Sequence, residues 1–133
     1  MLVSNRQPAP LDQGALTELA LTTLVGEGVE RGELSVSFVD EAEMEALHVR
    51  YLGEPGPTDV LSFSMGEGTP PMLGDVVICP AVAARNNPHD PGAELRLLLV
   101  HGILHLLGYD HEVDAERAEM WARQERYSGV VAP

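Results

Sequence analysis

Three of the five histidines of the chain lie in one short segment, His101-Gly102-Ile103-Leu104-His105-Leu106-Leu107-Gly108-Tyr109-Asp110-His111. His101 and His105 are four residues apart, so on a helix both imidazoles would project from the same face. Gly108 stands where helices commonly end in a left-handed residue, which would let the chain reverse and return His111 toward the other two rings. The spacing therefore predicts a site in which three imidazoles bind one metal ion.

Three neutral imidazoles with a fourth position left for water are typical of a catalytic zinc site, not of a closed structural one. Zinc in such a site lowers the pKa of the bound water and can polarise a phosphoryl oxygen. The spacing also matches the long zinc-binding motif of the metzincin peptidases, where a glutamate after the first histidine deprotonates the water. Gly102 holds that place here, so the protein base is unassigned. Asp110 is the nearby carboxylate, and a role in orienting a ligand or holding the turn is favoured over a catalytic one.

The segment that carries the first two histidines has the signals of a buried helix. Asp90 can cap its N-terminus, and Pro91 suits the first helical position, where no amide proton is needed. From Leu95 to Leu107 the residues are apolar almost all round, which predicts that this helix is central. An imidazole buried there without a partner would cost about 1 to 3 kcal/mol, and a metal ion supplies that partner.

Periodicity and turn residues predict a series of short elements around this helix. In chain order they are a helix over residues 12–25, a strand over 34–39, a helix that starts after Asp40, strands over 60–63 and 75–79, a short helix over 80–85, the histidine helix, and a last helix of about 15 residues ending near Ser128. In the second helix, Met44, Leu47 and Tyr51 are expected to face inward. The expected fold class is α+β: a single domain over residues 1–133, with a small, mostly four-stranded sheet and about five helices around the buried, zincin-like metal-bearing helix.

Composition restricts the class of protein and its partners. The formal net charge is -13, with 21 acidic residues against eight basic ones, all arginine, so bulk electrostatics repel a phosphate backbone and disfavour a stand-alone RNA-binding protein. The single cysteine, Cys79, excludes an intrachain disulfide and is expected to be a buried thiol. No apolar run reaches membrane-spanning length and the N-terminal residues lack a signal-peptide core, which predicts a cytoplasmic protein with no membrane partner.

Three segments resemble, in the same order, three blocks of the bacterial YbeY family: Pro57-Thr58-Asp59-Val60-Leu61-Ser62-Phe63, Leu73-Gly74-Asp75-Val76-Val77-Ile78-Cys79, and the histidine segment. The likeness runs over nearly the whole chain, and the third block is the most specific. It implies a compact sheet with helices around it and an endoribonuclease specific for single-stranded RNA, used in small-subunit ribosomal RNA maturation and ribosome quality control. It also implies one zinc ion per chain, held by His101, His105 and His111, and association with the small ribosomal subunit, whose basic proteins could deliver an acidic enzyme to its RNA.

The resemblance has one departure. Members of the family commonly carry an arginine, implicated in their RNA chemistry, after the aromatic residue that precedes the Pro57-Thr58 loop, whereas Tyr51 here is followed by Leu52. Arg50 is the nearest substitute, although on a helix it would project in a different direction.

The remaining polar and aromatic candidates are weaker. Thr58 and Ser62 are candidates for a substrate groove beside the metal, with ordinary surface positions favoured for both. His48 and His89 are expected to be surface histidines, and Trp121 is expected to pack in the core.

Three functions from different classes of protein are consistent with the sequence. The first is a zinc-dependent endoribonuclease. The second is a metal-dependent hydrolase that acts on peptides, which the motif spacing favours and Gly102 opposes. The third is a non-catalytic ribosome assembly factor with a structural zinc, which the replacement of the family arginine by Leu52 favours.

Overall fold

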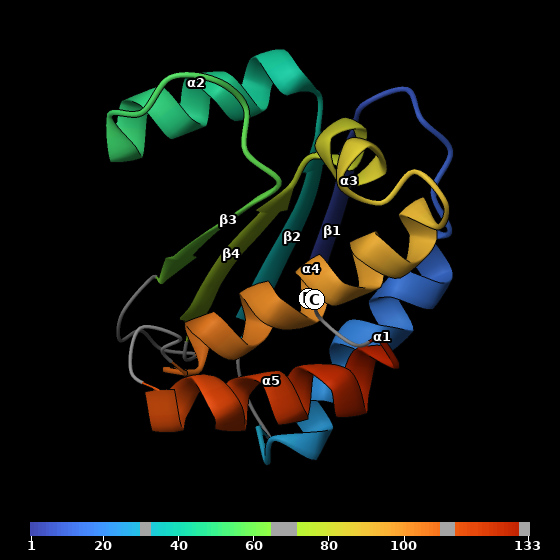
Figure 1. Ribbon diagram of the computed structural model, residues 1–133, viewed down its shortest axis with the longest axis vertical. Coiled ribbons are helices and arrows are strands. Elements are labelled where there is room, and N and C mark those ends of the chain that lie inside the picture. Colours follow the sequence, from blue (N-terminus) through green and yellow to red (C-terminus); the bar gives the residue numbers. More distant parts are fainter. Residues whose placement is uncertain (30–32, 65–71, 110–113, 131–133) are drawn as a thin grey trace.

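The computed structural model describes residues 1–29, 33–64, 72–109 and 114–130, and within them the chain forms a four-stranded sheet and five helices (Figure 1). The strand order is β1-β2-β4-β3. Strands β1 (Leu2–Arg6), β2 (Glu33–Val39) and β4 (Met72–Ile78) run parallel, whereas β3 (Val60–Ser64) pairs with β4 in the antiparallel direction at the sheet edge. The α+β class is therefore confirmed.

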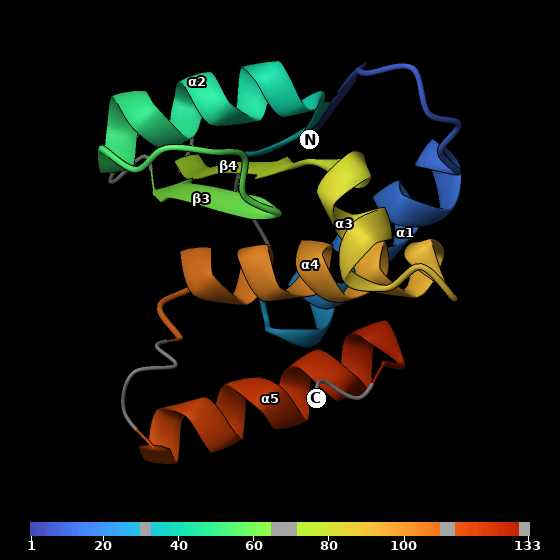
Figure 2. The same cartoon turned by 45° about the horizontal axis from the view of Figure 1, so that its top comes forward.

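The helices lie in layers on the two faces of the sheet (Figure 2). Helix α2 (Glu41–Leu52) covers one face. Helix α4 (Pro91–Leu106) crosses the opposite face, with α1 (Gln13–Gly26) and α3 (Pro80–Asn86) beside it. Helix α5 (Asp114–Ser128) lies against the side of α4 that is turned away from the sheet. None of the described helices combines the length and apolar character needed to cross a membrane.

Alternation along the central strands divides the apolar side chains between these faces. Phe38 and Ile78 belong to the larger core, which α1 and α4 close, whereas Val39 and Val77 belong to a smaller core with Met44 of α2. A third cluster joins α4 to α5 through Val100, Leu104 and Met120. The predicted burial of the histidine helix is confirmed, because α4 is covered by the sheet on one side and by α5 on the other.

The predicted burial of Cys79 is also confirmed, and burial raises the pKa of its thiol.

The helix starts at Asp40 and Asp90 are as predicted, whereas Asp12, expected as the first residue of its helix, is the capping residue before it. Helices α1, α2 and α4 each begin after an aspartate whose side chain accepts a hydrogen bond from the backbone amide three residues further on. Asp12 accepts from Ala15, Asp40 from Glu43, and Asp90 from Ala93. Pro91 occupies the first turn of α4 as predicted. Gly108 has φ +102°, so the expected left-handed backbone after α4 is present.

Three expectations need correction. Strand β1 is not evident in the sequence, because its Ser-Asn-Arg ending lacks apolar alternation, and it forms through parallel pairing with β2. Tyr51 was expected to face inward but is 53% exposed and contacts Phe63 at the rim of the smaller core. His48 is not a surface histidine: its side chain is only 12% exposed, and its Nδ1 lies 2.9 Å from the carbonyl oxygen of Gly56.

Helix α4 lies very close to the sheet at Gly102. A Cβ atom there would lie 2.7 Å from Cγ1 of Val76 and 3.1 Å from the hydroxyl oxygen of Ser62. Val76 is fully buried in β4, so it has no space into which to move. Gly102 therefore sets the distance between the histidine helix and the sheet, and no side chain fits at this place without a shift of the helix.

Replacing Gly102 by alanine is expected to lower the free energy of unfolding by about 1 to 2 kcal/mol, because overpacking costs more than the roughly 1 kcal/mol that alanine gains in a helix. Gly92→Ala is the matched control on the same helix, since its new Cβ would meet only ordinary contacts, the nearest at 3.6 Å. Chemical denaturation of both variants provides the measurement. A Gly102→Ala protein as stable as the Gly92→Ala protein would contradict the close-packing argument.

Candidate functional site

His101 and His105 lie one helical turn apart on the same face of α4. Their imidazole rings are almost parallel, with an interplanar angle of 4° and 6.4 Å between the ring centroids. His105 is exposed, whereas His101 is partly covered and meets the edge of the Trp121 ring, with 5.9 Å between the centroids. The structure thus brings two of the three predicted ligands together.

Gln124 of α5 holds the ring of His101. Its Oε1 lies 2.8 Å from Nδ1 of His101, and the glutamine is only 2% exposed. Because an amide oxygen can only accept, Nδ1 carries the proton and donates it, which places the lone pair of the neutral ring on Nε2. This is the arrangement in which a partner fixes the tautomer and direction of a metal-ligating histidine.

Sequence reasoning missed Gln124. The available signal was its place four residues after Met120, on the inward face of the last helix, where a polar side chain needs a buried partner.

The other predicted site residues differ in whether the structure describes them and whether they contact the histidine helix. His111 and Asp110 lie outside the described residues, and within the described part of the chain no group of three or more potential ligands gathers as a metal site would. Ser62 belongs to β3 and donates a hydrogen bond to the carbonyl oxygen of Gly102, at 3.3 Å, so it does contact the histidine helix. Thr58 instead donates to the neighbouring Asp59, at 3.4 Å.

Arg50 is not brought together with the histidines. It is exposed on α2, across the sheet from α4, and its guanidinium lies 5.3 Å from the centroid of the Tyr51 ring. Leu52, which stands in place of the family arginine, is 57% exposed at the end of the same helix. His89 is exposed, as predicted.

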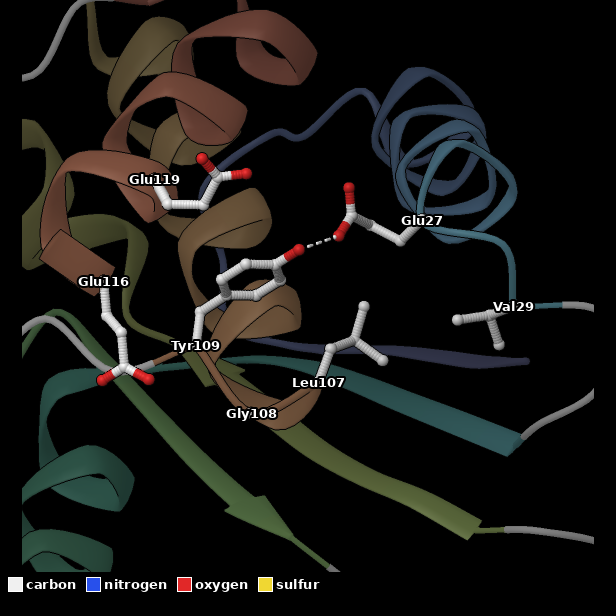
Figure 3. A pocket seen from close by; sticks show the side chains of 7 residues that line it. All are labelled: Glu27, Val29, Leu107, Gly108, Tyr109, Glu116 and Glu119. Atoms are coloured by element: carbon white, nitrogen blue, oxygen red, sulfur yellow. Dashed lines mark hydrogen bonds between the residues drawn. The ribbon is translucent and has the colours of Figure 1, made fainter.

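A buried carboxylate connects the turn after α4 to two helices. The side chain of Glu27, at the C-terminal end of α1, is 4% exposed and accepts hydrogen bonds from the hydroxyls of Tyr109 (2.7 Å) and Tyr127 (2.6 Å) and from Nη1 of Arg123 (2.7 Å). Figure 3 shows Glu27 and Tyr109 facing one another across a pocket of about 390 Å³. This cluster, which we call the Glu27 network, fixes Tyr109, the last described residue before the segment that holds His111.

The network shifts the ionisation of its members. Burial alone would raise the pKa of the Glu27 carboxyl, but the hydrogen bonds from Tyr127, Tyr109 and Arg123 together outweigh it and lower the pKa. Burial, followed by the hydrogen bond to Glu27, raises the pKa of Tyr109 to about 12. Both tyrosines therefore stay protonated as donors at neutral pH, and Glu27 stays ionised as their acceptor.

A second cavity, of about 620 Å³, opens beside His101. Its walls come from the start of β3, the end of α3, one face of α4 and the last turns of α5. They include Asp59, Asn86, Glu94, His101, Trp121 and Gln124. Trp121 was expected only to pack in the core. It does contact the α4–α5 cluster, and it also lines this cavity.

Comparison with known proteins agrees with this fold and these motifs. The family model described as endoribonuclease YbeY matches residues 4–130. The chain belongs to the YbeY family of endoribonucleases. Among its relatives, the YbeY endoribonuclease of Acidothermus cellulolyticus is 49% identical over 92% of this chain and 85% of the relative. Those of Thermobifida fusca and Streptomyces coelicolor are 48% and 43% identical, again over 92% of this chain, and over 87% and 84% of the relatives.

A solved structure shares the fold. The solution structure of a Thermotoga maritima protein superposes with a TM-score of 0.64 and 29% sequence identity, over 96% of this chain and 87% of that chain. The YbeY resemblance of the three segments is therefore confirmed, and the family is one of RNA-cleaving hydrolases.

Membership of the YbeY family weakens the peptidase alternative, and the geometry of α4 gives the physical reason. The base of a metzincin peptidase would stand at the place of Gly102, which faces Val76 and Ser62 of the sheet at distances that leave no room for a side chain. A glutamate there would not fit without a shift of the helix.

Proposed function

We propose that the protein is a zinc-dependent endoribonuclease that cleaves single-stranded RNA, in maturation and quality control of small-subunit ribosomal RNA in the cytoplasm. The observation that carries the zinc proposal is the pair of parallel imidazoles on α4, one of them oriented by the buried Gln124. The proposal of RNA as substrate rests on membership of the YbeY family.

The donor set fits zinc. His101 and His105 supply imidazole nitrogens from one helix face, and His111 follows the left-handed turn at Gly108 in the sequence. Three imidazoles are the donor set of catalytic zinc sites. When bound, zinc would supply Lewis acidity toward a phosphoryl oxygen and a water of lowered pKa.

The residues of the chain have separable tasks in this proposal. His101, His105 and His111 hold the ion, while Gln124 keeps the ring of His101 in one tautomer and one direction. Ser62 donates a hydrogen bond to the carbonyl of Gly102 and so links the sheet edge to the histidine helix. Asp110 remains the nearest candidate in sequence for accepting a proton.

A second candidate is a non-catalytic assembly factor of the small ribosomal subunit with a structural zinc. The observation that favours it is the position of Arg50, which lies on α2 across the sheet from the histidine helix, while Leu52 replaces the family arginine. In either case, a net charge of -13 makes a basic ribosomal protein the suitable partner for docking.

Cleavage assays with and without chelator separate these functions. We would incubate the zinc-loaded protein with labelled single-stranded RNA, duplex RNA and casein. The proposal expects single-stranded RNA to be cut, cutting to stop with chelator, and activity to return with added zinc. Casein cleavage would select the peptidase, and metal-retaining protein that cuts no substrate would select the assembly factor.

Replacing Gln124 by leucine is expected to weaken zinc binding by roughly 10- to 100-fold, because the ring of His101 loses the partner that fixes its tautomer. Gln124→Glu is the matched control, since a carboxylate accepts the same proton from Nδ1 and should retain the affinity. Competition with a zinc indicator dye measures both variants without any reference to activity. A Gln124→Leu protein with wild-type zinc affinity would show that His101 is not a ligand oriented in this way.

A further inference from the structure

We propose that the cavity beside His101 is a binding pocket for one nucleobase of the substrate, and that it prefers bases with an exocyclic amino group. This inference rests on the proposed function, because it takes RNA as the substrate and places the scissile strand near the histidines. Its volume of about 620 Å³ lies within the range of pockets that hold small ligands.

The pocket has an apolar floor and one aromatic wall. The apolar part is formed by Leu97 and Leu98 of α4 with Val60 and Val130, and the aromatic wall is Trp121, whose ring contacts that of His101. Flat aromatic bases bind to such surfaces by stacking and by apolar contact, and single-stranded RNA presents unstacked bases that can enter.

The polar wall, formed by Asp59, Asn86 and Glu94, presents mainly hydrogen-bond acceptors. Nδ2 of Asn86 lies 3.2 Å from Oδ2 of Asp59, and Asn86 also hydrogen-bonds Glu94. The amide donors of Asn86 are thus directed at carboxylates of its own wall, which leaves its carbonyl oxygen and the remaining carboxylate lone pairs to face a ligand.

An acceptor-rich wall selects the group that can donate to it. Carboxylates accept from exocyclic amino groups such as N4 of cytosine, whereas uracil presents carbonyl oxygens that would oppose them. The negative charges of Asp59 and Glu94 also repel phosphate, so the backbone of the RNA is expected to lie outside the cavity, on the side of His105. The same wall is unsuited to a phosphopeptide or a free phosphate.

The cavity is lined both by Glu94, where the base is proposed to bind, and by His101 of the candidate metal site. Glu94 lies on the same face of α4 as His101, seven residues before it, so about two helical turns separate them. That spacing of roughly 10 Å is close to the reach of one nucleotide, which would place the base against Asp59 and Glu94 and a neighbouring phosphate near the histidines.

Trp121 is the only tryptophan in the sequence, so the tryptophan fluorescence comes from a side chain that lines this pocket. We would titrate the intact, zinc-loaded protein with cytidine, adenosine and uridine, and with ribose 5-phosphate as the ligand without a base. These probes contain no phosphodiester bond to cleave. The proposal expects cytidine and adenosine to change the Trp121 emission at concentrations at least about fivefold lower than uridine, and ribose 5-phosphate to have no effect.

Glu94→Gln tests the polar wall, because it replaces an acceptor by a group that also donates. The preference for cytidine over uridine should fall by about fivefold or more, while Glu18→Gln, an exposed substitution on α1, should keep it. Equal responses to all three nucleosides, a response to ribose 5-phosphate, or a preference unchanged in Glu94→Gln would each overturn the proposal.

The two proposals fail in different ways. Nucleoside binding requires neither metal nor cleavage, so an intact base preference in a protein that cuts no RNA would overturn the proposed function alone. Chelator-sensitive cleavage without any nucleoside response would overturn the pocket alone.

Discussion

Replacing His105 by alanine is expected to abolish metal-dependent RNA cleavage, with a loss of at least roughly 10³-fold, because several kcal/mol of transition-state stabilisation depend on the ion. Zinc affinity should fall by more than the roughly 10- to 100-fold expected when only the partner of a ligand is lost. His105→Ala is a clearer test than His101→Ala, because His105 is exposed and its removal leaves the contact between the buried Gln124 and His101 in place.

The matched control is His89→Ala, which removes an exposed histidine from the loop before α4. Cleavage of labelled single-stranded RNA, together with metal content after dialysis, measures both variants. Thermal denaturation should show nearly the same Tm for the two proteins. A His105→Ala protein that keeps both zinc and cleavage would remove the histidine pair from the mechanism.

Replacing Glu27 by alanine is expected to have the largest effect on stability, a loss of about 3 kcal/mol. The substitution removes the acceptor of the Glu27 network and leaves the hydroxyls of Tyr109 and Tyr127 without it. The value is at the lower end for a broken buried pair because Arg123 is partly exposed and can turn to water. Glu27→Gln should cost less, since its amide oxygen still accepts, and Glu18→Gln on the exposed side of α1 should change little.

The same network predicts how stability responds to acid. The folded-state pKa of Glu27 is below its ordinary value of 4.5, so folding favours the ionised form. Its contribution is complete above the unfolded pKa and is lost as the pH falls through the lower folded pKa. Denaturation across an acidic pH series should therefore show a shallower decline for Glu27→Gln than for the wild type. Parallel curves would contradict the assignment.

Local signals in the sequence were sufficient for the parts of the fold that depend on neighbouring residues. The aspartates that cap α2 and α4, the left-handed glycine after α4 and the shared face of His101 and His105 all follow from spacings of a few residues. The periodicity of α4 also identified it as the buried helix, because its apolar residues surround it.

The parts that escaped prediction depend on contacts between distant segments. The hydrogen bond from Tyr127 to Glu27 joins residues 100 positions apart, and no local pattern marks Glu27 as buried. Gln124 contacts His101 only because α5 folds back along α4. Strand β1 is short and polar at its end, so its pairing with β2, not its own sequence, makes it a strand. His48 is likewise covered by a loop that its own contact with Gly56 helps to hold.

One helix, α5, supports much of this chemistry from outside the two cores that pack against the sheet. Trp121, Gln124 and Tyr127 of α5 serve the cavity, the ring of His101 and the Glu27 network in turn. Among the described residues, the two cores that pack against the sheet include no side chain of α5. A compound bound between α4 and α5 would therefore separate the ring of His101 from Gln124 and leave the two cores against the sheet in place, a route to inhibition that requires no mimicry of RNA.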